Sequence, residues 1–126
     1  MEPRNCVLLV DDSAPIRQSL RRAFEQAGWQ VCGEAGNGRE AIAKAEELHP
    51  QLILLDLAMP EMNGITAARL LKRRMPEVPL ILFTMYGDVF GAEEANSVGI
   101  SAVFSKTEAI EPMLEKARNL MGRNGA

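Results

Sequence analysis

Five short apolar runs alternate with five segments of helical periodicity, and this alternation constrains the fold more than any other feature of the chain. The apolar runs are residues 6–10, 30–35, 52–55, 79–83 and 102–105. Between and after them, apolar residues recur three or four positions apart, as they do on one face of an amphipathic helix. An order of this kind predicts a parallel sheet with right-handed crossovers and helices on both faces.

The composition of the runs predicts the order of the strands. Residues 7–10, 52–55 and 80–83 are apolar throughout, which is typical of strands that are covered on both faces and therefore central. The second and fifth runs are less apolar and suit the edges. The order 2-1-3-4-5 satisfies this assignment, so we predict a flavodoxin-like α/β fold, a doubly wound (βα)5 three-layer sandwich around a five-stranded parallel sheet.

Start and stop signals agree with the predicted helices. Ser13 can cap the first helix with Pro15 in its first turn, and Gly28 follows its end. The fourth helical segment, residues 89–98, has a thinner apolar stripe than the others, so we expect it to be the least firmly packed. The 126 residues are predicted to form one domain with a core of about 5–121, followed by a tail or truncated linker at 122–126.

Charge and composition exclude several classes of function. The formal net charge of −3 argues against direct nucleic-acid binding, which needs a basic surface. No run approaches the ~20 apolar residues of a membrane span, and the N-terminus lacks a signal-peptide pattern, so a cytoplasmic protein is expected. Cys6 and Cys32 lack metal-ligand spacing and are predicted to be buried free thiols, while His49 is expected to be exposed.

Reactive side chains follow four of the five predicted strands: Asp11 and Asp12, then Asp56, Thr84 and Lys106. Each alone has a simpler explanation, such as a helix cap, a turn acid or a solvated lysine. In an open α/β sheet, however, ligands bind outside the carboxyl ends of the strands at the point where the strand order reverses. We therefore expect three carboxylates, one hydroxyl and one ammonium group to converge on a single site.

The chemistry of these groups indicates a phosphoryl switch that depends on Mg²⁺. Closely packed carboxylates repel one another unless a cation lies between them, and hard oxygen ligands suit Mg²⁺. The metal can bridge a carboxylate and an incoming phosphoryl oxygen. Lys106 can pair with a phosphorylated carboxylate, an attraction of about 4 kcal/mol at about 4 Å before desolvation is counted. Thr84 can donate its hydroxyl to a phosphoryl oxygen.

Four separate segments resemble the receiver domains of bacterial two-component response regulators: Asp11-Asp12, residues 56–64, Thr84 and Ser105-Lys106. The resemblance extends from about residue 6 to the last helix. It implies that Asp56 accepts a phosphoryl group from a sensor histidine kinase or a phosphotransfer protein.

The same resemblance implies roles for the remaining site residues. Asp12 and Asp56 would bind Mg²⁺ directly together with the backbone carbonyl of Ala58, and Asp11 would act mainly through water. Thr84 and Lys106 would contact the phosphoryl group.

The resemblance further implies a switch whose output is conformational. The face formed by the fourth helix, fifth strand and fifth helix would change and act on a downstream protein or on an output domain outside the chain, with homodimerisation on phosphorylation left open. The only expected catalysis is the chain's own phosphorylation and slow autodephosphorylation, so it is not predicted to be an enzyme in the ordinary sense.

Three positions depart from the usual receiver pattern. Thr107 replaces the proline that commonly follows the lysine, so a trans peptide bond is expected there. Val103 takes the place of the usual switch aromatic, and Phe104 should face the opposite side of the sheet. Met85 follows Thr84 where a small residue is common. These features favour, weakly, the receivers that precede LuxR-type helix-turn-helix domains.

Two alternative functions follow from the same residues. A phosphatase of the haloacid-dehalogenase type also uses an aspartate at a strand end with Mg²⁺, but it needs an acid two residues later, where this chain has Ala58. A degenerate receiver that serves only as a docking module is the second alternative. The presence of all five expected site residues argues against it.

Overall fold

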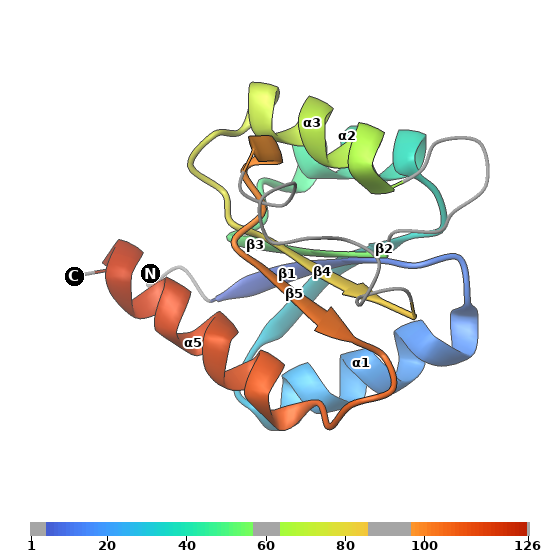
Figure 1. Ribbon diagram of the computed structural model, residues 1–126, viewed down its shortest axis with the longest axis vertical. Helices are drawn as coiled ribbons and strands as arrows, with labels where there is room; N and C mark the ends of the chain where they lie inside the picture. The colour runs from blue at the N-terminus through green and yellow to red at the C-terminus, as the bar shows by residue number, and fades with distance from the viewer. Residues whose placement is uncertain (1–4, 57–63, 86–96, 126) are drawn as a thin grey trace.

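The computed structural model describes residues 5–56, 64–85 and 97–125, with side chains described as far as residue 121 in the last segment. Its sheet consists of β1 (Cys6–Val10), β2 (Gln30–Ala35), β3 (Leu52–Leu55), β4 (Leu80–Thr84) and β5 (Ala102–Ser105). All neighbouring strands are parallel, in the order β2-β1-β3-β4-β5 (Figure 1). The predicted flavodoxin-like topology is confirmed, with β2 and β5 at the edges.

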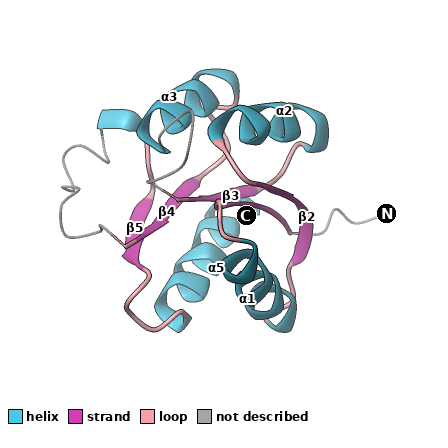
Figure 2. Ribbon diagram, turned by 90° about the vertical axis from the view of Figure 1, so that its right-hand side faces the viewer, coloured by secondary structure: helices cyan, strands magenta, loops and turns pink. Residues whose placement is uncertain are grey.

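Helices cover both faces of this sheet. Helices α1 (Ala14–Gln26) and α5 (Glu111–Gly125) lie on one face, and α2 (Gly38–Leu48) and α3 (Gly64–Arg74) lie on the other (Figure 2). Most of the expected fourth helix, residues 89–98, falls outside the described residues. The three-layer arrangement follows from strands that carry apolar side chains on both faces.

Alternation along the strands divides the core into two clusters. Leu8 and Val10 pack in the cluster under α2 and α3, whereas Val7 and Leu9 pack in the cluster under α1 and α5. The same alternation separates the neighbours on β5: Val103 packs against the first cluster and Phe104 against the second. The prediction that Phe104 faces away from the side of Val103 is therefore confirmed.

The helix termini use the expected signals. The Ser13 hydroxyl accepts a hydrogen bond from the backbone N–H of Ile16, and proline lies in the first turn of α1. Gly28, just beyond that helix, has φ +93°, a conformation that glycine adopts at little cost. At the start of α2, the Asn37 side chain accepts from the N–H of Glu40, whose carboxylate accepts from the N–H of Gly36.

The bounds of β4 and α5 differ from the prediction. β4 runs from Leu80 to Thr84 rather than over residues 79–83, and at its end the backbone of Thr84 continues the ladder and pairs with Ser105 of β5. α5 runs to Gly125, so residues 122–125 are helical where the sequence predicted a tail. Adding a residue to an existing helix costs only its propensity, about 1 kcal/mol for glycine, and the preceding turns supply the hydrogen-bond pattern.

The two cysteines do not remain free. Cys6 and Cys32 lie on neighbouring strands with Cα atoms 5.6 Å apart and form a disulfide, so the prediction of two free thiols is wrong. The predicted strand order makes β1 and β2 neighbours, but the pairing of the two cysteines also depends on the register of these strands, which their spacing in the sequence does not reveal. His49 is exposed, as expected.

A bulge interrupts the pairing of β1 with β2. Val7 pairs with Val31, but Leu8 pairs with Gly33, so Cys32 is the extra residue of β2. Beyond the bulge, Gly33 faces α2, where an added Cβ would lie 2.6 Å from Cδ1 of Leu48. Glu34 consequently faces α1.

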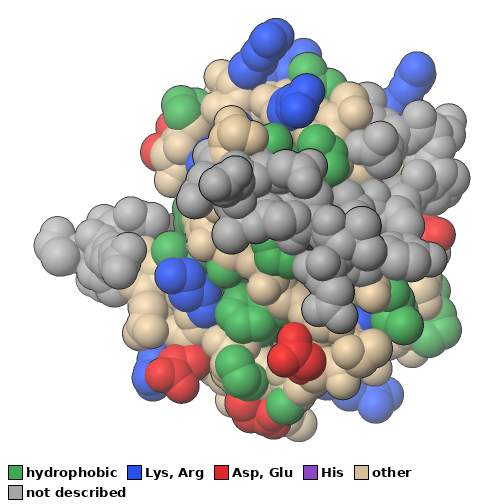
Figure 3. Space-filling view, in the orientation of Figure 1, with side chains coloured by type: hydrophobic (Ala, Val, Ile, Leu, Met, Phe, Trp, Pro, Cys, Tyr) green, Lys and Arg blue, Asp and Glu red, His purple; other side chains and the backbone are tan. Residues whose placement is uncertain are grey.

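Charged side chains of both signs surround this core. Basic side chains gather over the α2–α3 layer at the top of Figure 3, whereas acidic and basic side chains are interspersed over the opposite layer at the bottom. Helix α3 carries Lys72, Arg73 and Arg74 in its last turn, where positive charge complements the negative end of the helix dipole.

Candidate functional site

Backbone hydrogen bonds that prolong the sheet ladder fix the residues at the carboxyl ends of the strands. The N–H of Asp11 donates to the carbonyl of Ala35 at 3.0 Å, and the N–H of Asp56 donates to that of Val10 at 2.9 Å. On the other side, the N–H of Lys106 donates to the carbonyl of Thr84 at 2.9 Å. These positions are therefore set by the backbone ladder of the sheet, and core strands of this kind are among the last parts of a fold to open.

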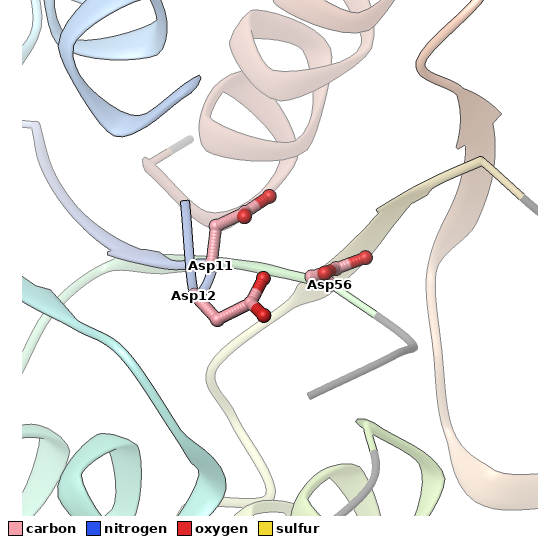
Figure 4. Close-up of side chains that lie close together, drawn as sticks. All are labelled: Asp11, Asp12 and Asp56. Carbon is pink, nitrogen blue, oxygen red and sulfur yellow. The ribbon is translucent and has the colours of Figure 1, made fainter. Parts of the chain in front are cut away.

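Three carboxylates meet at this end of the sheet. One oxygen from each of Asp11, Asp12 and Asp56 lies within 4.8 Å of the others. Figure 4 shows the first two at the end of β1 and the third at the end of β3, with the Asp12 carboxylate pointing towards Asp56. Asp11 and Asp56 are only 2% and 4% exposed, whereas Asp12 is exposed. The prediction that these residues converge is confirmed.

Lys106 joins two of these acids. Its Nζ lies 2.5 Å from Oδ2 of Asp11 and 3.5 Å from Oδ1 of Asp56, and its side chain is 8% exposed. Lys106 is therefore no solvated surface lysine. Three carboxylates and one ammonium group leave the cluster with a formal excess of two negative charges, which one divalent cation would balance.

The donor set fits a hard cation. Magnesium and calcium prefer carboxylate and carbonyl oxygens, and Mg²⁺ commonly binds through one or two carboxylates while keeping several waters. One exposed acid beside two buried ones provides such ligands together with access for water. Ala58, the fourth expected ligand through its carbonyl, lies outside the described residues.

Thr84 and Met85 lie at the carboxyl end of β4, the strand next to β3. Thr84 is fully buried as the last residue of its strand, and its carbonyl is tied to Lys106. Met85 follows directly and is 58% exposed, the most conspicuous exposed large apolar side chain among the described residues. The peptide bond between Lys106 and Thr107 is trans, as expected, and no cis bond occurs in the described part of the backbone.

The loop that carries Asp11 and Asp12 has further supports that the sequence did not single out. The N–H of Ser13 donates to Oδ1 of Asp11 at 2.9 Å, and Nη1 of Arg17 donates to the carbonyl oxygen of Asp11 at 2.5 Å. Nε of Arg17 in turn lies 2.8 Å from a carboxylate oxygen of Glu34. Arg17 and Glu34 meet through the packing of α1 on β2, so only a three-dimensional structure reveals the contact.

Glu34 also binds Arg21, whose Nε and Nη2 donate to the second carboxylate oxygen at 2.9 and 2.8 Å. Partial burial alone would raise the pKa of the Glu34 carboxyl, but the hydrogen bonds and charges of Arg21 and Arg17 outweigh burial and lower it. The same contact raises the pKa of the Arg21 guanidinium. Glu34 is therefore held as a carboxylate between two arginines.

Residues 7–118 match the family model described as the response regulator receiver domain, and the chain belongs to this family. No helix among the described residues combines the length and apolar character needed to cross a membrane. The fold and the cluster of three carboxylates are thus those of a chain that the family model places among the receiver domains.

Three relatives illustrate the family. The chain is 41% identical over 93 residues to the chemotaxis protein CheY of Thermotoga maritima, covering 74% of this chain and 78% of that protein. It is 33% identical over 113 residues to the response regulator protein VraR of Staphylococcus aureus, covering 89% of this chain and 54% of VraR, so the chain spans about half of that relative. The crystal structure of the response regulator domain of Thermotoga maritima CheB superposes with a TM-score of 0.86 at 31% identity, covering 95% of this chain and 98% of that domain.

Proposed function

We propose that this chain is the phosphoacceptor switch of a two-component system, in which Asp56 receives a phosphoryl group in a reaction that depends on Mg²⁺. The observation that carries the proposal is the cluster at the strand ends. A buried Asp56 lies beside two further carboxylates and within 3.5 Å of the Lys106 ammonium group. The phosphoryl donor would be the phosphohistidine of a sensor kinase or of a phosphotransfer protein.

In the proposed reaction, a carboxylate oxygen of Asp56 attacks the phosphorus atom in line with the leaving group. The bond between phosphorus and the histidine nitrogen breaks, its electron pair stays on the imidazole, and an acyl phosphate forms on Asp56. Magnesium, when bound, supplies positive charge between the carboxylates and the phosphoryl oxygens. Lys106 supplies a second positive charge, and the Thr84 hydroxyl donates to a phosphoryl oxygen.

The proposed ligands are Asp12, Asp56 and the carbonyl of Ala58, with Asp11 acting through water. Two observations support this division between the neighbouring acids. Asp12 is exposed, whereas the Asp11 carboxylate is buried and engaged by Lys106 and by the N–H of Ser13.

The proposed output begins with the groups that join the acyl phosphate to β4 and β5. Thr84 is the last residue of β4, Lys106 follows β5, and a backbone hydrogen bond links the two, so a shift of one would be transmitted to the other. The fourth helix, β5 and α5 would then rearrange and act on a downstream protein or on an output domain outside this chain. We place the protein in the cytoplasm, where its kinase would phosphorylate it, and propose no direct contact with nucleic acid or membrane.

The test is phosphoryl incorporation followed by intact mass. Incubation with a phosphohistidine donor or acetyl phosphate and Mg²⁺ should add one phosphoryl group to the wild type and none to Asp56→Asn, which keeps the size of the side chain. Incorporation that persists in the variant would refute Asp56 as the acceptor. Repeated turnover of a generic phosphate ester would instead support the phosphatase alternative.

A parallel measurement isolates the metal. Mg²⁺ at a concentration equal to its dissociation constant should stabilise the folded wild type by about 0.4 kcal/mol in thermal melts. Asp12→Ala should remove this increment because it removes the exposed ligand. Full Mg²⁺ stabilisation of the variant would show that the metal binds elsewhere.

A further inference from the structure

Arg17 connects the metal-binding loop to the edge of the sheet through two different nitrogens. Nη1 donates to the carbonyl oxygen of Asp11 at 2.5 Å, and Nε lies 2.8 Å from Oε1 of Glu34. The side chain is only 20% exposed, and it passes beneath Gly36, where an added Cβ would lie 3.8 Å from Nη1. The guanidinium is thus held at both ends within the structure.

The bond to the carbonyl of Asp11 acts on the peptide that links the two acids of this loop. That peptide joins the carbonyl of Asp11 to the backbone nitrogen of Asp12. Holding the peptide plane therefore holds the Asp12 Cα atom, from which the Asp12 side chain extends. The N–H of Asp11 is bound to Ala35 and its carboxylate to Lys106 and Ser13, and none of these contacts engages the Asp11 carbonyl itself. Arg17 binds that carbonyl directly.

We propose that Arg17 is a positioning residue for the divalent-cation site, and that Glu34 orients it. The inference rests on the proposed function, since it concerns the same metal site. Groups that orient metal ligands typically change metal affinity by 10–100-fold when they are removed. Arginine suits the task because its planar fork offers several donors in fixed directions from different nitrogens, whereas lysine presents its donors from a single freely rotating atom.

The sign of the change in Mg²⁺ affinity on removal of Arg17 distinguishes a positioning role from an effect of its charge alone. A positive charge near a cation site opposes binding, so a role of Arg17 through charge alone would make its removal tighten Mg²⁺. A positioning role predicts the opposite. Arg21 provides a matched control, because it binds the same Glu34 carboxylate and carries the same charge, yet of these two arginines only Arg17 donates to the carbonyl of Asp11 among the described contacts.

The experiment measures metal affinity in the 126-residue wild-type chain and in its variants Arg17→Ala and Arg21→Ala. Mn²⁺ replaces Mg²⁺ as the probe, its free concentration is followed by electron paramagnetic resonance, and Mg²⁺ is then measured by competition. Arg17→Ala should bind both ions at least about tenfold more weakly, and Arg21→Ala should bind them as wild type or slightly more tightly. Equal affinities for the two variants, or tighter binding by Arg17→Ala, would overturn the proposal.

Thermal melts in EDTA show whether each variant is folded in the absence of metal, so a loss of metal affinity can be told from unfolding. If Arg17→Ala is too unstable to titrate, Arg17→Lys retains the charge and one hydrogen bond, and it should fold while still losing metal affinity. Wild-type affinity in Arg17→Lys would overturn the proposal. Failure of wild type itself to bind either ion would instead refute the metal site of the proposed function, and this inference with it.

Discussion

Replacing Lys106 by methionine should destabilise the protein because it leaves two buried carboxylates without their common cation. Methionine keeps the unbranched apolar stem of the side chain and lacks only the terminal ammonium, so the main change is the loss of the charge. Nζ of Lys106 lies 2.5 Å from Asp11 and 3.5 Å from Asp56, and the ammonium is almost fully buried.

The magnitude follows from these distances. At an effective dielectric constant near 20, Coulomb's law gives attractions of about 7 and about 5 kcal/mol for the two pairs before desolvation is subtracted. Breaking buried ion pairs by removing one partner typically costs about 3–5 kcal/mol. We therefore expect the unfolding free energy of Lys106→Met to fall by about 3 kcal/mol in EDTA, which corresponds to a Tm lowered by roughly 10 °C for a domain of this size.

Mg²⁺ should reverse part of this loss. A divalent cation among the carboxylates replaces the missing ammonium charge, so Mg²⁺ should stabilise Lys106→Met more than it stabilises wild type. Urea unfolding at neutral pH with EDTA and with saturating Mg²⁺ measures both quantities.

Lys72→Met is the matched control. Burial lowers the pKa of the Lys72 ammonium although Glu77 opposes the shift, and Nζ donates to the carbonyls of Pro76 and Val78 at 3.0 and 2.9 Å. The loss of unfolding free energy caused by Lys72→Met should not change with Mg²⁺, because Lys72 contacts none of the three clustered aspartates in the described contacts. A loss below about 1 kcal/mol in Lys106→Met, or one that Mg²⁺ leaves unchanged, would refute the reasoning.

Two further predictions concern lifetime and pH. Met85 is 58% exposed and follows Thr84, so we expect its side chain to hinder the water that attacks the acyl phosphate. Phosphorylated Met85→Ala should therefore lose its phosphoryl group faster than wild type in single-turnover decay, about tenfold faster for each ~1.4 kcal/mol by which the barrier falls. An equal or slower decay would contradict this. Glu34 has a folded-state pKa below its unfolded value of about 4.3, so its contribution to stability is complete above that value and disappears as the pH falls through the folded pKa. The unfolding free energy of Glu34→Gln should accordingly fall less steeply than that of wild type as the pH is lowered below about 5, and parallel pH profiles would rule out a stabilising Glu34 carboxylate.

The sheet could be predicted from the sequence because its strands differ in how fully they are buried. Uninterrupted apolar runs appear only where helices cover both faces, which distinguishes β1, β3 and β4 from the edges. Once the strand order is known, residues that follow the strands must share one end of the sheet. The meeting of Asp11, Asp12, Asp56 and Lys106 was therefore accessible without coordinates.

Contacts that depend on how helices pack or on the register of paired strands were not accessible in this way. Arg17 and Glu34 are ordinary charged residues of an amphipathic helix and an edge strand, and nothing in their types or spacing marks the bond to Asp11. The bond between Cys6 and Cys32 was missed because the predicted order makes β1 and β2 neighbours without giving their register, which the bulge at Cys32 shifts.

The bulge in β2 gives this edge strand one residue of spare length. Val31 and Ala35 would point to the same face in a regular strand, yet they belong to the core clusters on opposite faces. The reason is that Cys32 has no partner on β1, so the alternation of side chains shifts by one residue there. Omitting this residue would leave Leu8 opposite Gly33 and Glu34 still beside α1, at the cost of the covalent link to Cys6. In an alignment of related chains, a single-residue gap at the bulge would thus leave the remaining side chains of β2 on the same faces of the sheet. A single-residue gap within the fully paired β1 would instead move the side chains beyond it to the opposite face.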